Sequence, residues 1–233
     1  MQNKYLLEIS VESVEAAMAA ERGGAGRIEV CRDLSVGGLT PDAGFIISTR
    51  ANVQAPIFVM IRPRAGDFVY SNEEFAAMRK SIKLAKQLQM DGVVLGILKA
   101  DSQIDVARTR ELVTLASPAP VTFHRAFDEC VSLPTSVEDV IKTGATRLLT
   151  SGGKRTAPEA LGVLGDLVRI AGERLMVMPG SGIHAGNIRE TVQKTGAREF
   201  HAALSSVVAE PANNLGAFEE EVRRLVAAIR DCD

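Results

Sequence analysis

Ionisable residues lie inside or at the end of short apolar segments at five widely separated points of the chain. They are Glu8, Glu29, Arg62, His124 and His201. Burial of such a group is unfavourable unless it has a partner, so these positions are candidates for chemistry. Two carboxylates, a guanidinium and two imidazoles could support proton transfer on a carbonyl or sugar substrate. The alternative is a set of structural ion pairs, for example Glu8 or Glu29 held by Arg62.

The segment Pro120–Asp128, PVTFHRAFD, shows how such a residue would be positioned. A proline fits the first residue of a strand, and the residues after it alternate in polarity. Val121, Phe123 and Phe127 would lie on one face, and His124 would lie on the other. We therefore expect a strand with apolar groups directed outward and a histidine directed inward, as in the wall of a parallel barrel.

Active-site groups in such barrels lie at the C-terminal ends of the strands. The end of this segment would place Arg125 and Asp128 beside His124. Asp128 is therefore a further candidate catalytic residue. The alternative is a structural histidine next to a solvated Arg125–Asp128 ion pair.

A short apolar run, then turn residues, then a helical pattern recurs about eight times along the chain, at intervals of roughly 25–30 residues. The predicted strands are Leu6–Val11, Arg27–Cys31, Pro56–Arg62, Gly92–Leu98, Pro120–His124, Arg147–Thr150, Leu175–Met178 and Glu199–Leu204. The predicted helices are Glu12–Arg22, a helix that begins at Pro41 and is capped by Thr40, Glu73–Gln89 capped by Ser71 or Asn72, Ile104–Ala116, Thr135–Thr143, Ala157–Ala171, Ala185–Thr195 and Leu215–Arg230.

Eight parallel strands can close into a barrel or form an open, doubly wound sheet. The units are regular, and no linker or midpoint break interrupts them. This favours an α/β fold, a TIM-type (β/α)8 barrel, formed by residues 1–233 as a single domain.

The composition excludes several function classes. A net charge of −2 and the absence of Lys/Arg runs give no electrostatic reason to bind nucleic acid or a membrane surface. The N-terminal residues MQNKYLLEIS lack the apolar core of a signal peptide, and no apolar run is long enough to span a bilayer. The three cysteines, Cys31, Cys130 and Cys232, are irregularly spaced, which indicates free thiols in a reducing compartment. We expect a cytoplasmic protein.

Two glycine-rich loops follow the sixth and seventh predicted strands and lead toward helices. Backbone amides at such positions can bind an anion, and barrels often hold phosphate after strands seven and eight. The candidate anion-binding residues are Ser151, Gly152, Gly153, Gly180, Ser181 and Gly182. Tight turns that require glycine are the alternative explanation. The spacing differs by one residue from a dinucleotide-binding loop, so we do not expect a dinucleotide.

A metal site is a further hypothesis. Cys31 ends the second predicted strand, so its sulfur could reach the barrel mouth. Cu(I) prefers thiolate and thioether ligands, and Met60, Met178 and Cys130 are candidate companions. A small buried hydrophobic residue is the alternative role of such a cysteine. No H-x-H or H-E-x-x-H zinc spacing is present.

Long motifs in a fixed order resemble the CutC family: RIEVCRDLSVGGLTP, VMIRPRAGDFVYS, PVTFHRAFD, LLTSGG and VMPGSGI. The resemblance extends from about Leu7 to Ser206. It implies a cytosolic copper-homeostasis protein with a TIM-barrel-like fold, a homo-oligomer (dimer or tetramer), and a Cu(I) role for Cys31. The chain departs from the family at HAALSS, where the usual pattern is H-x-S-A-R; His201 matches, but the arginine is absent.

Three functions follow from these observations. The first is copper homeostasis with Cu(I) bound at Cys31. The second is a lyase or isomerase that acts on a small carbonyl or phosphosugar compound. In that enzyme, Glu8 or Glu29 would be the base, His124 an acid or electrophile, and Arg62 an anion clamp. The third is a barrel with a structural polar mouth that serves as a subunit of a larger assembly.

Overall fold

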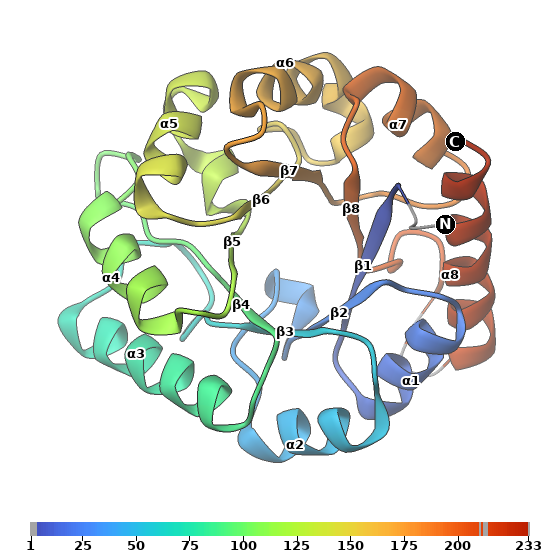
Figure 1. The fold of residues 1–233 in the computed structure, drawn as a ribbon, viewed down its shortest axis with the longest axis horizontal. Coiled ribbons are helices and arrows are strands. Elements are labelled where there is room, and N and C mark those ends of the chain that lie inside the picture. The colour runs from blue at the N-terminus through green and yellow to red at the C-terminus, as the bar shows by residue number, and fades with distance from the viewer. Residues whose placement is uncertain (1–3, 210, 212–213, 233) are drawn as a thin grey trace.

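Eight parallel strands surround a common axis in the computed structural model, which describes residues 4–209, 211 and 214–232 (Figure 1). Neighbouring strands pair in the order β7-β6-β5-β4-β3-β2-β1-β8, and a parallel bridge between Gly180 and His201 joins β7 to β8. The predicted (β/α)8 barrel is therefore confirmed. The strands are β1 Leu6–Val11, β2 Arg27–Val30, β3 Ile57–Met60, β4 Gly92–Leu95, β5 Val121–Phe123, β6 Arg147–Thr150, β7 Met176–Pro179 and β8 Glu199–Ala202.

A ring of helices encloses the strands, and the two marked chain ends lie on the same side of the molecule (Figure 1). The helices are α1 Val14–Arg22, α2 Ala43–Asn52, α3 Asn72–Gln87, α4 Val106–Ala116, α5 Leu133–Thr143, α6 Leu161–Ala171, α7 Ile188–Thr195 and α8 Leu215–Arg230. Within the described ranges, three short 3₁₀ helices lie in loops: η1 Leu34–Val36, η2 Arg125–Glu129 and η3 Ala157–Ala160.

The N-terminal caps of α3 and α2 show where the predicted helix starts are right and where they are wrong. Ser71 caps α3 in a capping box with Glu74, as one of the two predicted caps. The predicted start of α2 at Pro41 with a Thr40 cap is wrong. Asp42 is the cap, and the Thr40 hydroxyl instead exchanges hydrogen bonds with the backbone of Arg62. Because its hydroxyl is engaged in this tertiary contact, Thr40 does not cap the helix.

Other helix boundaries also differ from the prediction. The predicted helix 157–171 is divided into η3 and α6, and α7 begins at Ile188 rather than Ala185. The second glycine-rich loop therefore does not lead directly into a helix. Consequently its amides do not benefit from a helix N-terminus.

Strands β3, β4 and β8 end earlier than predicted, because parallel pairing stops where each chain segment leaves the barrel. The predicted strand end at His124 is one residue too late, and the expected alternation does not continue to Phe127. β5 ends at Phe123, and η2 follows, because the side chain of His124 accepts a hydrogen bond from the amide of Ala126 and so starts the turn. Phe127 is buried, but not on a strand.

Side chains alternate along the strands between an apolar outer layer and an interior that is polar at β1, β2 and β8 and apolar at β3 and β4, where Phe58, Met60 and Val94 lie. Ile9, Val30 and Phe123 belong to the large apolar core between the strands and the helices. Glu8 lies opposite His201 in the register of β1 and β8, and Ser10 lies opposite Glu29 in the register of β1 and β2. Because paired residues on adjacent strands point to the same face, the polar residues converge inside the barrel.

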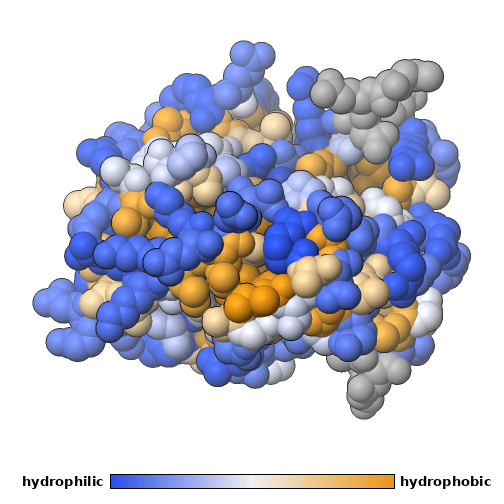
Figure 2. Space-filling model, turned by 60° about the horizontal axis from the view of Figure 1, so that its bottom comes forward, coloured by the Kyte–Doolittle hydropathy of each residue, from blue (hydrophilic) through white to orange (hydrophobic). Residues whose placement is uncertain are grey.

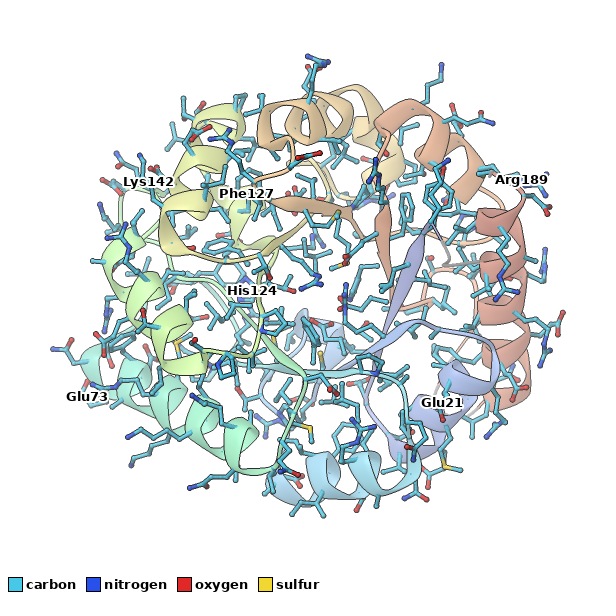
Figure 3. The ribbon with its side chains drawn as sticks, viewed as in Figure 1. Glu21, Glu73, His124, Phe127, Lys142 and Arg189 are labelled. Carbon is cyan, nitrogen blue, oxygen red and sulfur yellow. The ribbon has the colours of Figure 1, made fainter. Side chains whose placement is uncertain are left out.

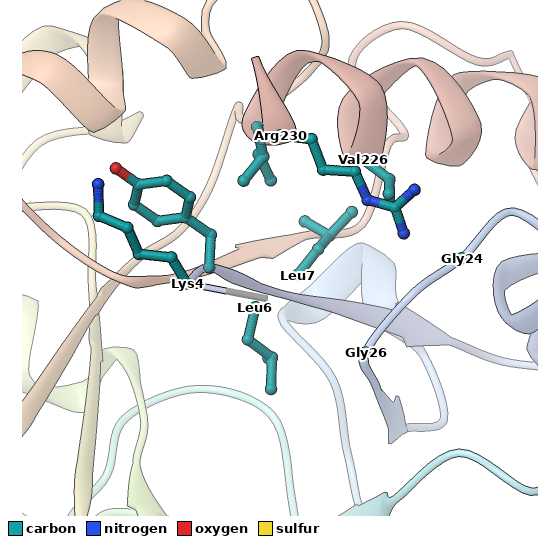
Figure 4. A pocket seen from close by; sticks show the side chains of 9 residues that line it. Lys4, Leu6, Leu7, Gly24, Gly26, Val226 and Arg230 are labelled. Carbon is teal, nitrogen blue, oxygen red and sulfur yellow. The ribbon is translucent and has the colours of Figure 1, made fainter. Parts of the chain in front are cut away.

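The face shown in Figure 2 is mainly polar, and apolar groups gather near its centre, with smaller apolar areas elsewhere on it. A small cavity of about 170 Å³ lies beside the start of β1 and the end of α8, next to Leu6, Val226 and Arg230 (Figure 4). It is at the end of the barrel opposite the C-terminal mouth. None of the helices in the described ranges combines the length and apolar character needed to cross a bilayer.

Candidate functional site

A pocket of about 660 Å³ occupies the C-terminal mouth of the barrel, and we call it the mouth pocket. The predicted site residues that line it are Glu29, Arg62, His124, Asp128, Ser181, Gly182 and His201. Figure 3 shows His124 inside the ring of strands. The other predicted residues, which do not line it, are Glu8, Cys31, Ser151, Gly152, Gly153 and Gly180. Residues from strands far apart in the chain thus meet at one mouth, as expected for this fold.

A buried ion-pair network lies in the barrel beside the acidic residues of the pocket. The guanidinium of Arg27 donates hydrogen bonds to Glu8 and, over 2.5 Å, to Glu199. Arg147 donates to the same carboxylate of Glu199 over 2.9 Å, and the Arg27 guanidinium lies 4.7 Å from the centre of the Phe58 ring. The alternative of a structural ion pair is therefore confirmed for Glu8, but its partner is Arg27 and not Arg62.

Three side chains form what we call the acid–histidine cluster: Glu8, Glu29 and His201. His201 Nε2 lies 3.0 Å from a Glu29 carboxylate oxygen and 3.9 Å from Glu8 Oε1. Burial acts to lower the pKa of His201, but Glu29 and Glu8 outweigh it, so the pKa is raised. Burial also raises the pKa of Glu8, an effect that the attraction of Arg27 does not fully offset and that Glu29 reinforces.

Arg62 organises loops rather than pairing with a carboxylate. Its guanidinium donates hydrogen bonds to the backbone carbonyls of Val36 (2.7 Å), Gly38 (3.2 Å) and Gly66 (2.9 Å), and it lies 4.8 Å from the centre of the Phe68 ring. Only the buried Nε lacks a hydrogen-bond partner among the described residues. Arg62 therefore holds two loops at the pocket wall, and its buried Nε–H is a donor that these loops do not use.

His124 is a buried, neutral imidazole. Burial lowers the pKa of its imidazole to about 3, helped by the positive charge of Arg62. Nδ1 accepts a hydrogen bond of 3.2 Å from the amide of Ala126, so the proton of the neutral ring resides on Nε2. Nε2 is buried and has no hydrogen-bond partner in the described part of the chain. Such a group can donate a hydrogen bond to a carbonyl oxygen, and it is not a general acid near neutral pH.

Asp128 fills the first predicted anion site with its own carboxylate. It accepts hydrogen bonds from the amides of Ser151 (3.1 Å) and Gly153 (3.0 Å), and from the hydroxyls of Thr150 (2.5 Å) and Ser151 (2.9 Å). Arg125 donates to it over 2.9 Å, so the pair of the ion-pair alternative forms, but the Asp128 side chain is largely buried (8% exposed) rather than solvated. The amide of Gly152 donates instead to the Thr150 hydroxyl. The loop at Ser151–Gly153 is thus engaged within the chain, and Asp128 is fully hydrogen-bonded.

The second glycine-rich loop keeps free donors. Gly180 donates its amide to Thr150, but the amides of Ser181 and Gly182 have no acceptor among the residues that the structure describes. Both residues have positive φ (76° and 70°) and line the mouth pocket together with Arg155. Where the family pattern has an arginine after β8, Ala203 to Ser206 line the pocket here. These amides are the available anion donors at the mouth.

Cys31 lies one layer behind the pocket wall. Its side chain packs with Met60, Phe58 and Val94, and it is fully buried. A β-carbon on Gly38 would come within 3.2 Å of the Cys31 sulfur and 3.4 Å of the Met60 terminal carbon, so both sulfur-containing side chains converge on this glycine. Burial raises the pKa of the Cys31 thiol well above its usual value, and Glu29 raises it further.

The other proposed copper companions are located elsewhere. Met178 accepts a hydrogen bond from Arg27 over 3.5 Å in the buried ion-pair network, and Cys130 packs against the outer core. The remaining soft-metal candidates are Cys31, which directly follows β2, and Met60, which ends the neighbouring strand β3.

Sequence reasoning missed Arg27, Ser10 and Arg155 as members of the mouth and its supporting network. Two of them could have been found from the alternation of side chains along a strand, which places residues two apart on the same face. Arg27 is two residues before Glu29, and Ser10 is two residues after Glu8, so each must share an inward face with its acidic neighbour. No such signal existed for Arg155, because it lies in a loop.

Comparisons with known proteins agree with this architecture. The family model described as the CutC family matches residues 5–206, a range that includes every residue lining the mouth pocket. A family protein CutC from Chromobacterium violaceum is 46% identical over 204 residues, covering 88% of this chain and 83% of the relative. A copper homeostasis protein cutC homolog from Mus musculus is 46% identical over 204 residues, covering 88% of this chain and 75% of the relative.

A solved structure of CutC from Streptococcus agalactiae superposes with a TM-score of 0.81. It is 31% identical in sequence, and the match covers 85% of this chain and 98% of that chain. The similarity therefore extends to the arrangement of the whole barrel.

Proposed function

Because this chain belongs to the CutC family, we propose that it acts in copper homeostasis by binding Cu(I) through the sulfur of Cys31. The supporting observation is the convergence of the Cys31 and Met60 side chains on Gly38. A thiolate and a thioether are the ligand types that Cu(I) prefers. In this role the metal ion is cargo, and Leu34, Met60 and the loop held by Arg62 separate it from the pocket.

Cys31→Ser is expected to abolish the binding of a single Cu(I) per chain, because a hydroxyl is a poor ligand for a soft ion. Met60→Leu should weaken binding while preserving side-chain volume. The measurement is an anaerobic titration against a chromophoric Cu(I) chelator. Cys232→Ser is the matched control, since Cys232 follows α8. Wild-type affinity in the Cys31→Ser variant would remove this proposal.

A second candidate function is supported by the unpartnered His124 Nε2 beside the mouth pocket. In this proposal the protein is a lyase or isomerase for a small carbonyl or phosphosugar compound. His124 donates a hydrogen bond to the substrate carbonyl, and Arg62 Nε supplies a further donor. The amides of Ser181 and Gly182, with Arg155, bind the anionic end of the substrate. Glu29 is the candidate base.

His124→Ala is expected to weaken binding of a pocket ligand roughly tenfold, because it removes one hydrogen bond from a buried donor. Thermal-shift titrations with a panel of small phosphorylated aldehydes and ketones provide the measurement. His184→Ala is the matched control. His184 Nδ1 accepts a hydrogen bond from the amide of Gly186 in a similar turn, but His184 does not line the mouth pocket. Equal effects of the two substitutions, or no stabilising compound, would count against the enzyme.

We also propose a cytoplasmic location and a homo-oligomeric state. The three cysteines are free, which suits a reducing compartment. The oligomer rests on the family resemblance, and light scattering coupled to size-exclusion chromatography tests it.

A further inference from the structure

The acid–histidine cluster has the geometry of a cation site made of hard ligands. Its three ligand atoms, one each from Glu8, Glu29 and His201, all lie within 4.8 Å of one another. The three residues come from β1, β2 and β8, which are adjacent in the barrel wall. Rigid strands therefore hold them, rather than loops.

Unpartnered polar atoms surround the same point. Glu8 Oε1 and Glu29 Oε1 are buried and have no hydrogen-bond partner among the described residues. Ser10, outside the cluster, is 1% exposed, and its hydroxyl is also unpartnered. It lies opposite Glu29 in the strand register and lines the mouth pocket with Glu29 and His201. A buried hydroxyl without a partner is unfavourable, so a ligand at this point would satisfy it.

The charges at this position also leave room for a cation. Three carboxylates (Glu8, Glu29 and Glu199) meet two guanidiniums (Arg27 and Arg147), which leaves one negative charge when His201 is neutral. Arg27 binds Glu8 through Oε2, so Oε1 remains directed toward His201. Either a proton on His201 or a bound cation can supply the missing positive charge.

We propose that Glu8, Glu29 and His201 bind a divalent transition-metal cation at the base of the mouth pocket. Two carboxylate oxygens and one imidazole nitrogen suit Zn²⁺, Mn²⁺ or Co²⁺ and do not suit Cu(I). Three protein ligands leave coordination positions open, and these positions face the pocket. The site is thus distinct in its chemistry from the sulfur pair at Cys31 and Met60, and a molecule in the pocket can reach the metal directly.

The test uses the full chain, freed of metal by a chelator and titrated with Co²⁺. We expect saturable binding of a single ion, with visible d–d absorption bands and no sulfur-to-cobalt charge-transfer band. Glu29→Gln and His201→Gln should each weaken binding by more than the roughly 10–100-fold that loss of an outer partner of a metal ligand causes. His124→Gln, in the same pocket, and Cys31→Ser should bind Co²⁺ like the wild type.

A measurement on the wild-type protein guards against variants that fail to fold. The chain has three histidines, so their imidazole NMR signals can be assigned. Bound Co²⁺ should broaden or shift the His201 ring signals far more strongly than those of His184, because only His201 would be a ligand. Absence of saturable Co²⁺ binding, wild-type affinity in both Glu29→Gln and His201→Gln, or a charge-transfer band that disappears in Cys31→Ser would each overturn the proposal. The cluster would then be a histidine-bridged carboxylate pair or part of a thiolate site.

Discussion

Arg27→Met is expected to lower the free energy of unfolding by about 3–5 kcal/mol, the typical penalty for removing one partner of a buried ion pair. The Arg27 side chain is 3% exposed and binds both Glu8 and Glu199. Without Arg27, the buried negative charge of Glu8 would lose its guanidinium partner, and that of Glu199 would keep only Arg147. Denaturation by urea, followed by circular dichroism in the absence of metal ions, measures the change.

The exposed pair between Arg22 and Glu219 offers the matched control, because the Arg22 side chain is 53% exposed. Arg22→Met should leave the unfolding midpoint unchanged within error. Adding Glu8→Gln to Arg27→Met should restore part of the lost stability, since it removes one of the unpaired charges. Equal stability of Arg27→Met and the wild type would mean that the interior network is hydrated and energetically neutral.

Acidification from pH 7 to pH 5 is expected to reduce stability by about 2 kcal/mol through His124 alone. The pKa of this imidazole is about 3 in the folded protein, because burial and Arg62 disfavour its charged form, against 6.5 for the unperturbed group. Between these two values the unfolded chain binds a proton that the folded chain does not. Stability is therefore retained above the unfolded value and declines as the pH falls toward the folded value.

The comparison with His124→Gln isolates this contribution, because the titration of all other groups is common to both proteins. The variant should lose about 2 kcal/mol less than the wild type over the same pH interval. Urea denaturation at several pH values provides the data. Parallel curves for the two proteins would show that His124 takes up a proton readily in the folded state, and the neutral-imidazole role in the second proposed function would fail with it.

The two proposed metal sites make different use of neighbouring residues on one strand. Glu29 lies on β2 and Cys31 directly follows that strand; they are two residues apart and so point to the same inward face, yet only Glu29 lines the pocket. Leu34 and Met60 cover the sulfur of Cys31. The sulfur is thereby covered on the side of the pocket, although Glu29 is close enough to Cys31 to raise the pKa of its thiol. The two titrations use ions of different softness, so the Cu(I) experiment tests the sulfur pair and the Co²⁺ experiment tests the acid–histidine cluster.

The repeating pattern of apolar runs, turn residues and helical segments was sufficient to predict the barrel. Alternation along a strand is a local property, so the inward direction of Glu8, Glu29, His124 and His201 followed from their neighbours in the chain. Their convergence at one mouth then followed from the fold, because parallel strands present their C-terminal ends at the same side.

The partners of these residues were decided only by the tertiary structure. Glu8 pairs with Arg27 rather than Arg62, and Asp128 fills the glycine-rich loop that was expected to bind an external anion. Both outcomes depend on strand register, on the length of each side chain and on which polar group lies within hydrogen-bond distance of a buried donor. These properties relate residues that are distant in the chain. The hydrophobic periodicity and local propensity of a segment therefore do not predict which residue pairs with which.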